Sequence, residues 1–333
     1  VFTLNFFGQK NETKSFTIGS TKYKELKLSG ELESLRLNGK LNLIQPSSTF
    51  QKKKLQVSKK VSYTKKAGST CYDYMPPAVP PQPPLVDDQS IQVNLPFDFF
   101  FYGTTYNSLW INDNGTVSFD QGHGAFTAQG FPLPIATAGA QEIIAPFWAD
   151  FHQAGMASGP IYFEVLPTAL IVHWEDVGYF NSHDDKLNTM MLVLTDGFDP
   201  ILQPGSNVGF FYEDMQWTTG DASSGIAGFG GDAATVGANK GDGVNYIQLG
   251  RFDGPGTAYD GPFTTNDSVS WLDNKTFMFN VGNSNNLPPI VAGIEICDTL
   301  RLCVGDTLPI NASFLAPEAN QITWVKIDSI QAP

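Results

Sequence analysis

Residues 109–120 read LWINDNGTVSFD, in which three polar residues and a glycine separate two short runs that carry large apolar side chains. The Asn114-Gly115 pair predicts a two-residue type I′ turn, because both central residues of that turn need positive φ. With this turn, Trp110 faces Phe119 across the two strands. The stretch therefore predicts a β-hairpin with an aromatic pair on one face.

The polar residues of the same stretch allow a second interpretation, a Ca²⁺ site at the end of a sheet. Asn112, Asp113 and Asn114 would supply its oxygen ligands. An EF-hand loop also needs a bidentate Glu at its twelfth position, and the sequence after Asp113 offers none. We therefore predict a turn and no cofactor, with loosely held Ca²⁺ as the alternative.

The composition extends the β interpretation to the rest of the chain. The 333 residues include 25 Phe, 32 Gly and 22 Pro, and only 16% are charged. Short apolar runs between turn residues are typical of all-β proteins. From residue 86 to 281 these runs are QVNLPFDFFFYG, LWINDNG, TVSFD, PIYFEVLP, ALIVHWEDV, MMLVLTDG, VGFFYEDMQW, YIQLGRF and KTFMFNVG. The continuously apolar MMLVL predicts a central strand, and only ATAGAQEIIAPF suggests a short helix. The sequence contains no run of 18 apolar residues, so it predicts no transmembrane segment.

The charge is unevenly distributed. Residues 1–70 carry 14 Lys and Arg against 4 Asp and Glu, whereas the remainder carries 6 against 29. These lysines lack the interleaved arginines and stacking aromatics of nucleic-acid sites, and the acidic remainder would repel phosphate. We predict no nucleic-acid partner and interpret the lysines as a solvated surface that faces another part of a surface assembly.

The N-terminal region also shows a β pattern. Residues 22–44 alternate leucine with polar residues around Ser29-Gly30 and Asn38-Gly39, which predicts strands joined by turns. A small β-solenoid rung is the second interpretation. Residues 1–8 fit either a first strand or the remnant of a signal peptide. The proline-rich MPPAVPPQPPL at 75–85 predicts an extended segment that acts as a stiff spacer or lies over a sheet.

Candidate chemistry is sparse. The sequence contains no HExxH, GxSxG or Cys/His constellation. Metal sites are conceivable at His152 with Asp150 and at His183 with Asp185, but such neighbours arise easily in loops. Glycosidase chemistry needs two carboxylates that face one sugar, and the sequence cannot place any two of its acidic residues opposite each other. We therefore predict that the protein is not an enzyme.

The central region resembles the nidogen-type extracellular (NIDO) module over about residues 90–281. The segments that carry the resemblance are, in chain order, LPFDFFFYGTTYNSLWINDNGTVSF, EIIAPFWADF, VHWEDVGYF followed by DKLNTMMLVLTDG, and NVGFFYEDMQWTTGD. The resemblance implies an extracellular, disulfide-poor β module of adhesion and matrix proteins without catalytic residues. MMLVL departs from the family, which typically has an aromatic-glutamine pair there.

The C-terminal flank is similar to the start of the immunoglobulin-like repeat arrays in very large bacterial adhesins, including those of gliding bacteria. The segment is CVGDTLPINASFLAPEANQITW, and because such a repeat needs about 100 residues we expect the protein to continue beyond Pro333. The predicted organisation is a small basic β domain at 1–70, a proline-rich linker at 71–89, a NIDO-like β-sandwich at 90–281, a linker at 282–293 and the truncated first part of an immunoglobulin-like β-sandwich repeat at 294–333.

Two kinds of covalent modification are candidates in this flank. Cys297 and Cys303 form a disulfide if the chain turns between them, and otherwise they are two buried thiols, with Cys71 left over. An Asp-Ser/Thr-apolar pattern resembles the O-glycosylation acceptor of some gliding bacteria. It occurs at Ser268, Thr299, Thr307 and Ser329, and ordinary turn chemistry, in which Asp and Ser/Thr bind nearby backbone, is the alternative explanation.

Taken together, these features predict the N-terminal region of a large secreted cell-surface adhesin, possessing adhesive or fibre-assembly contacts and a role in gliding motility. Its partners would be other proteins of a surface, secretion or motility assembly, or surface glycans. We predict that the contacts involve the loop from Trp217 to Gly231, with Trp217, Asp221 and Phe229. The alternative is a carbohydrate-binding or glycan-degrading module in which an exposed Trp217 or Trp174 stacks on sugar.

Overall fold

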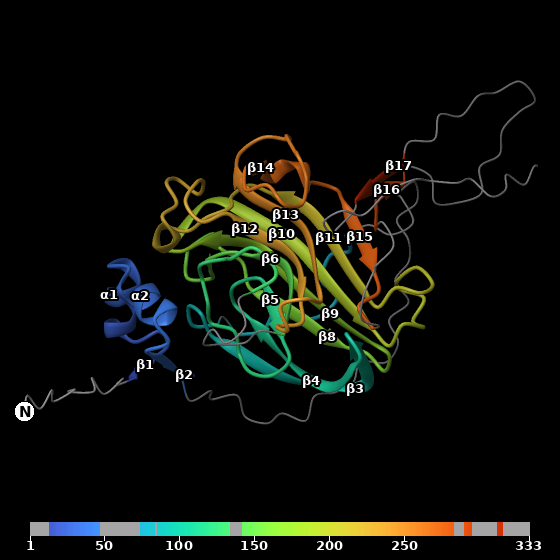
Figure 1. Cartoon of the computed structure of the whole chain (residues 1–333), viewed down its shortest axis with the longest axis horizontal. Coiled ribbons are helices and arrows are strands. Elements are labelled where there is room, and N and C mark those ends of the chain that lie inside the picture. Colours follow the sequence, from blue (N-terminus) through green and yellow to red (C-terminus); the bar gives the residue numbers. More distant parts are fainter. Residues whose placement is uncertain are drawn as a thin grey trace, which may run out of the picture.

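Two β-sheets packed face to face form the body of the protein (Figure 1). The structure is a computed structural model that describes residues 13–46, 74–83, 85–133, 142–282, 290–294 and 312–315. In these residues the fold is mostly β, as predicted, but it also contains two short α-helices that the sequence pattern did not indicate.

The first sheet has the order β15-β11-β10-β9-β7, and β8 also pairs with β9. MMLVL lies in β10 between β9 and β11, and its side chains are fully buried, so the predicted central strand is confirmed. The strands are β7 (Phe151–His152), β8 (Ile161–Val165), β9 (Ala169–Tyr179), β10 (His183–Thr195), β11 (Val208–Met215) and β15 (Thr276–Phe279).

The second sheet has the order β14-β13-β12-β6-β5-β4-β3. Its strands are β3 (Ser90–Phe101), β4 (Thr104–Asn112), β5 (Thr116–Ser118), β6 (Ile143–Trp148), β12 (Ala234–Asn239), β13 (Tyr246–Gly254) and β14 (Asp267–Ser268). Short 3₁₀ turns, η1 (Asp221–Ser223) and η2 (Val269–Trp271), interrupt the loops. The inward-facing side chains of both sheets form one large apolar core.

Two predictions inside this body are wrong. The strand β6 begins at Ile143, within the stretch that suggested a helix, because its apolar residues are buried on both faces between β5 and β12. The strand β12 lies between VGFFYEDMQW and YIQLGRF, a stretch in which the sequence pattern predicted no strand. Its small residues hide the alternation by which a strand is recognised.

The hairpin of residues 109–120 exists, but its register differs from the predicted one. Asn112 pairs with Thr116 and Trp110 with Ser118, so the loop has three residues rather than two. Gly115 alone has positive φ there, at 67°, which fits a three-residue hairpin with glycine in the left-handed position. Phe119 therefore stacks on Phe101 instead of facing Trp110.

The N-terminal region folds as a β-α-α-β unit, not as a β domain or a solenoid rung. The parallel strands β1 (Lys14–Thr17) and β2 (Leu41–Ile44) flank the helices α1 (Thr21–Leu28) and α2 (Glu31–Leu37). Ser20 caps α1 by accepting a hydrogen bond from the Tyr23 amide. Glycine at position 30, with φ of 74°, permits the tight junction of the two helices.

The proline-rich segment lies over the first sheet, as one of the two interpretations held. Tyr74 and Met75 pack against the outer apolar face that includes Ile171 and Met191. The amide of Gln82 donates to the Ile161 carbonyl at 3.1 Å. At the other end of the chain, β16 (Ile290–Ile294) and β17 (Ala312–Leu315) form a separate antiparallel pair. The remainder of the predicted immunoglobulin-like region lies outside the described residues.

Candidate functional site

The most unusual feature of the fold is a buried lysine at the junction between the N-terminal unit and the two sheets. Lys27 lies on α1 on the same face as Tyr23 and Leu26, because residues three and four apart share one side of a helix. Its side chain is 0% exposed. A lysine ammonium is almost never fully buried without partners, so this arrangement needs compensating charge.

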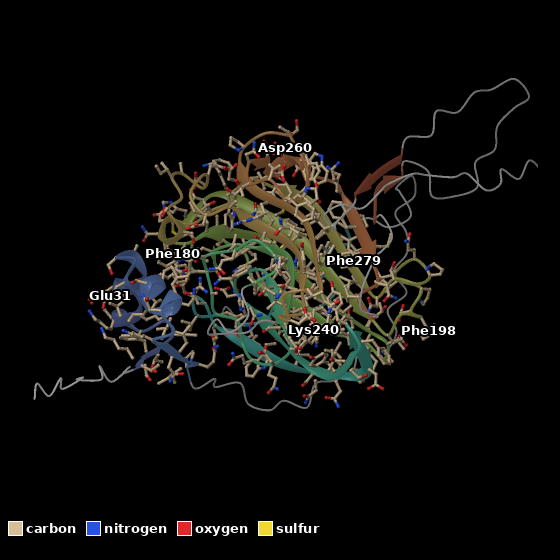
Figure 2. All side chains as sticks on the ribbon, in the orientation of Figure 1. Glu31, Phe180, Phe198, Lys240, Asp260 and Phe279 are labelled. Carbon is tan, nitrogen blue, oxygen red and sulfur yellow. The ribbon has the colours of Figure 1, made fainter. Side chains whose placement is uncertain are left out.

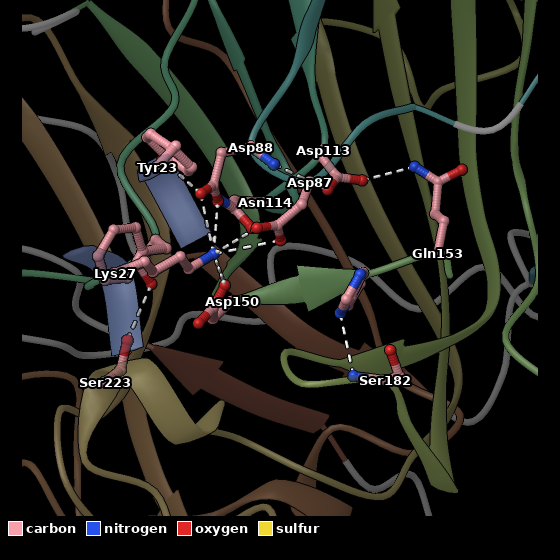
Figure 3. A network of polar contacts seen from close by, with 12 residues as sticks. Tyr23, Lys27, Asp87, Asp88, Asp113, Asn114, Asp150, Gln153, Ser182 and Ser223 are labelled. Atoms are coloured by element: carbon pink, nitrogen blue, oxygen red, sulfur yellow. Dashed lines mark hydrogen bonds and ion pairs between the residues drawn. The ribbon is translucent and has the colours of Figure 1, made fainter. Parts of the chain in front are cut away.

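Three carboxylates provide that charge. The Lys27 Nζ lies 2.7 Å from Asp150 Oδ1, 2.9 and 3.0 Å from the two Asp88 oxygens and 3.2 Å from both Asp87 oxygens. Asp87 and Asp88 lie three and two residues before the start of β3, whereas Asp150 lies in the turn between β6 and β7. The ammonium therefore joins three segments that are far apart in sequence (Figure 3).

The hairpin loop of residues 113–115 supports these carboxylates from behind. Asn114 Nδ2 donates to Asp88 Oδ1 at 2.6 Å, and Asp113 Oδ2 accepts from the Asp88 amide at 3.2 Å. Gln153 donates to the other oxygen of Asp113. The stretch that predicted a turn is thus a turn whose polar side chains are buried in a charged network, and the Tyr23 hydroxyl completes it by donating to Asp88.

Burial and the neighbouring charges shift the pKa values of the residues in this network. Burial raises the pKa of Asp87 to about 7, with Asp88 adding to the rise and Lys27 opposing it. Burial also raises the pKa of Asp150, again against the effect of Lys27. Burial alone would lower the pKa of Lys27, but Asp150, Asp87 and Asp88 outweigh it and raise that pKa, so the lysine stays charged.

Apolar contacts around the ion cluster fix the N-terminal unit to the sheets. Tyr23, Leu26 and Leu32 pack with Phe126 of the body, and Ala222 of η1 packs against the same cluster. The Lys27 Nζ lies 4.4 Å from the ring centre of Phe126 and 3.9 Å from that of Phe180, which places it over both aromatic faces. The buried lysine and its apolar surroundings therefore act as one docking site.

The predicted contact loop lies next to this site, but its residues play different parts. Trp217 is fully buried and its indole donates to the Val177 carbonyl, so Trp217 is a core residue and not an exposed contact. Asp221 accepts from Asn181 and lies 3.0 Å from His183 Nε2. Phe229 is partly buried against the core. A large apolar residue of the loop, Ile226, is 82% exposed, and the sequence analysis did not single it out.

The hypothesis that a tryptophan of this region stacks on sugar is wrong for both named residues. Trp174 is fully buried like Trp217, and its indole donates to the Asp113 carbonyl. Nor do the two proposed His/Asp pairs form: His152 Nδ1 accepts from the Ser182 amide while Asp150 binds Lys27.

His183 likewise faces Asp221, whereas Asp185 binds Tyr179 and Lys186. Sequence proximity therefore did not predict which side chains meet.

Of the candidate modification sites, only Ser268 belongs to the described residues. It lies in β14 and is 8% exposed, so the folded protein offers little access to its hydroxyl. The other candidates lie outside the described part of the chain: Cys71, Cys297, Cys303, Thr299, Thr307 and Ser329. In the described part, no helix is long and apolar enough to span a membrane.

Comparison with known proteins places the two-sheet body within one protein family. Residues 62–279 match the family described as NIDO related. The chain belongs to the NIDO-related family. Mouse and human alpha-tectorin are each 33% identical to it over 196 residues, which cover 50% of this chain and 8% of each relative. Nidogen of Drosophila melanogaster is 26% identical over 169 residues, or 42% of this chain and 12% of that protein. No solved structure shows a significant match.

The chain thus spans about a tenth of the length of these relatives. Only some residues of the ion cluster lie within the range that matches the NIDO-related family. Asp87, Asp88 and Asp150 lie within residues 62–279, whereas Lys27 lies in the N-terminal unit before them. The acidic triad therefore belongs to the NIDO module, and the ammonium that fills it comes from a neighbouring element.

Sequence signals for this site existed but were weak. The adjacent Asp87 and Asp88 follow the apolar Leu85-Val86, where a loop would normally turn its charges to solvent. Lys27 follows Tyr23 by four residues, which becomes informative only if the segment is read as a helix. The interpretation of the N-terminal lysines as a solvated surface is wrong for Lys27.

A buried histidine of the NIDO module gives a pH prediction. Burial lowers the pKa of His173 from its ordinary 6.5 to about 3. The unfolded chain binds this proton more tightly than the folded chain does, so protonation of His173 favours unfolding. The contribution of neutral His173 to the free energy of unfolding is therefore complete above pH 6.5 and is lost as the pH falls towards 3. The expected slope is up to ~1.4 kcal/mol per pH unit.

Urea unfolding of the wild-type protein and of His173→Gln from pH 7 to pH 4 would measure this pH dependence of the free energy of unfolding. The raised pKa of Asp87 has the opposite sign below about pH 7, and the lowered pKa of His152 has the same sign as His173. Since both are common to the two proteins, the difference isolates His173. Parallel curves would contradict the prediction.

Proposed function

We propose that this chain is an extracellular, non-catalytic adhesion or assembly segment, in which the NIDO module presents loops to a protein partner. The observation that carries the proposal is the match of residues 62–279 to the NIDO-related family. The resemblance of the sequence motifs to the NIDO module implies a module of adhesion and matrix proteins. The finer proposal is a distal region of a large secreted bacterial surface protein, with immunoglobulin-like repeats after it and a role in gliding motility.

The geometry of the charged cluster supports a non-catalytic role. Hydrolysis of a glycoside needs two carboxylates with room for a sugar between them. Here the space between Asp87, Asp88 and Asp150 holds the Lys27 ammonium, and all four side chains are buried. The cluster is therefore built to hold two parts of the chain together.

Loop tips offer the exposed apolar side chains that a partner could cover. Ile226 is 82% exposed in the loop that runs from Trp217 to Gly231, and Phe198 is 91% exposed in the loop after β10. Aromatic and aliphatic anchors dominate the binding energy of protein interfaces. We propose Ile226, together with Asp221 and Phe229, as the contact patch of the longer loop.

Beads coated with the purified chain and mixed with intact cells of the source organism would test this proposal. We expect the beads to adhere, adhesion to disappear after protease treatment of the cells, and free sugars to have no effect. Ile226→Asp should reduce adhesion at least ~10-fold, because a buried anchor becomes an unpaired charge. Phe198→Asp is the matched exposed-apolar control.

The outcomes separate the candidate functions. Adhesion that survives protease but is lost to glycosidase or free sugar would favour the carbohydrate-binding alternative. Absence of adhesion by wild-type beads would contradict both adhesive functions. Loss of adhesion with Phe198→Asp but not with Ile226→Asp would move the contact patch to the other loop.

A further inference from the structure

The oxygen atoms around Lys27 Nζ are arranged like the ligands of a metal ion. An ammonium has three N–H donors, yet five carboxylate oxygens lie within 3.2 Å of this nitrogen. One oxygen from each of Asp87, Asp88 and Asp150 lies within 4.8 Å of the others. That spacing matches the width of a Ca²⁺ shell, whose Ca–O bonds are about 2.3–2.6 Å.

The charge of the cluster favours a second cationic charge. Lys27 supplies one positive charge to three buried carboxylates, and Asp113 lies behind them as a fourth acid. Lys24, which also acts on Asp87, is exposed to solvent. A divalent ion in place of the ammonium would balance the carboxylates more closely, which is the usual condition for burying them.

Two buried oxygens at the site also lack partners. Within the described part of the chain, no donor reaches Asp150 Oδ2 or Asn114 Oδ1, although both side chains are fully buried. Buried acceptors normally have a hydrogen bond or an ion. Asn114 already binds Asp88 through its amide nitrogen, so its oxygen belongs to the same small region (Figure 3).

We propose that Asp87, Asp88 and Asp150 form a Ca²⁺ site of the NIDO module, and that Lys27 of the N-terminal unit occupies it as a built-in competitor. The acids come from the NIDO-related region and the ammonium does not. Occupation by Ca²⁺ therefore requires Lys27 to leave, which releases the N-terminal unit and uncovers Phe126 and Phe180. Ca²⁺ is preferred over Mg²⁺, since Mg²⁺ demands a tighter octahedral shell.

Calorimetric titration of the EDTA-treated full chain with CaCl₂ tests the site. Lys27→Met keeps most of the apolar stem and removes the ammonium, so we expect one Ca²⁺ per chain, bound at least ~10-fold more tightly than by wild type. Adding Asp150→Asn to this variant should weaken binding at least ~10-fold. Lys22→Met, on the exposed side of α1, should titrate like wild type.

The proposal is overturned if Lys27→Met keeps its near-ultraviolet circular dichroism and binds Ca²⁺ no better than wild type. It is also overturned if Asp150→Asn does not weaken the binding. A measurement on the wild-type chain covers the case in which the variant fails to fold. Ca²⁺ at ~10 mM, above the ~10⁻⁴–10⁻³ M Kd of extracellular calcium modules, should speed tryptic cleavage after Lys24 and Arg36 several-fold. The same concentration of Mg²⁺ is the control, and a cleavage rate that ignores Ca²⁺ would overturn the competition.

Discussion

Lys27→Met should lower the free energy of opening of the N-terminal unit by about 3–5 kcal/mol, because it leaves buried carboxylates without their counter-charge. The methionine fills much of the same volume, so the loss comes from charge and not from a cavity. Protonation of Asp87, whose pKa burial raises to about 7, would recover part of the loss at low pH. Hydrogen exchange of the α1 amides measures the opening directly.

The matched control for this change is Lys22→Met on the same helix. Lys22 pairs with Glu25 at 3.2 Å, and both side chains are more than 60% exposed. Exposed pairs contribute about 0–1 kcal/mol, so α1 exchange should hardly change. Equal exchange in Lys27→Met and Lys22→Met would show that the buried cluster does not hold the unit in place.

A double variant that removes the charges of both Lys27 and Asp150 tests whether the two side chains act together. In Lys27→Met combined with Asp150→Asn, fewer buried carboxylates lack a partner than in Lys27→Met alone. The double variant should therefore open less readily than the single one, as expected for residues in direct contact. Additive effects would indicate that the two side chains act separately.

The two sheets were largely predictable from the sequence, and the N-terminal unit was not. Strands such as β10 can be recognised in the sequence by their long apolar runs, because these residues are buried in the sheet. In residues 22–44 the leucines alternate like those of a strand, but Leu28 and Leu37 are exposed in the structure. The buried residues of the two helices are instead Tyr23, Leu26, Lys27 and Leu32, and helices of only eight and seven residues give the helical spacing little room to repeat.

The charged site was unpredictable for a different reason. Its members are brought together only by tertiary structure, since Lys27 and Asp150 are 123 residues apart in sequence. Asp113 and Asn114 did attract notice, and their turn interpretation holds in outline. A turn residue normally points to solvent, however, and sequence alone could not show that Asp88 and Gln153 bind the side chains of this turn in the interior.

Trp217→Ala should destabilise the NIDO module by about 3–5 kcal/mol, the cost of truncating a large buried aromatic. The indole packs edge-on against Phe151 at 4.7 Å between ring centres and donates to the Val177 carbonyl at 2.9 Å. The backbone of Trp217 is in turn held by Asn188, which binds both its amide and its carbonyl. Urea unfolding followed by circular dichroism measures the change.

Phe198→Ala is the appropriate control, because Phe198 is 91% exposed and its truncation should change stability by less than about 0.5 kcal/mol. The comparison also decides how any loss of binding in Trp217→Ala is interpreted. If that variant loses adhesion together with stability, the loss reflects an altered loop and not a missing contact. Unchanged stability with lost adhesion would contradict the buried position of Trp217 and restore it to the contact surface.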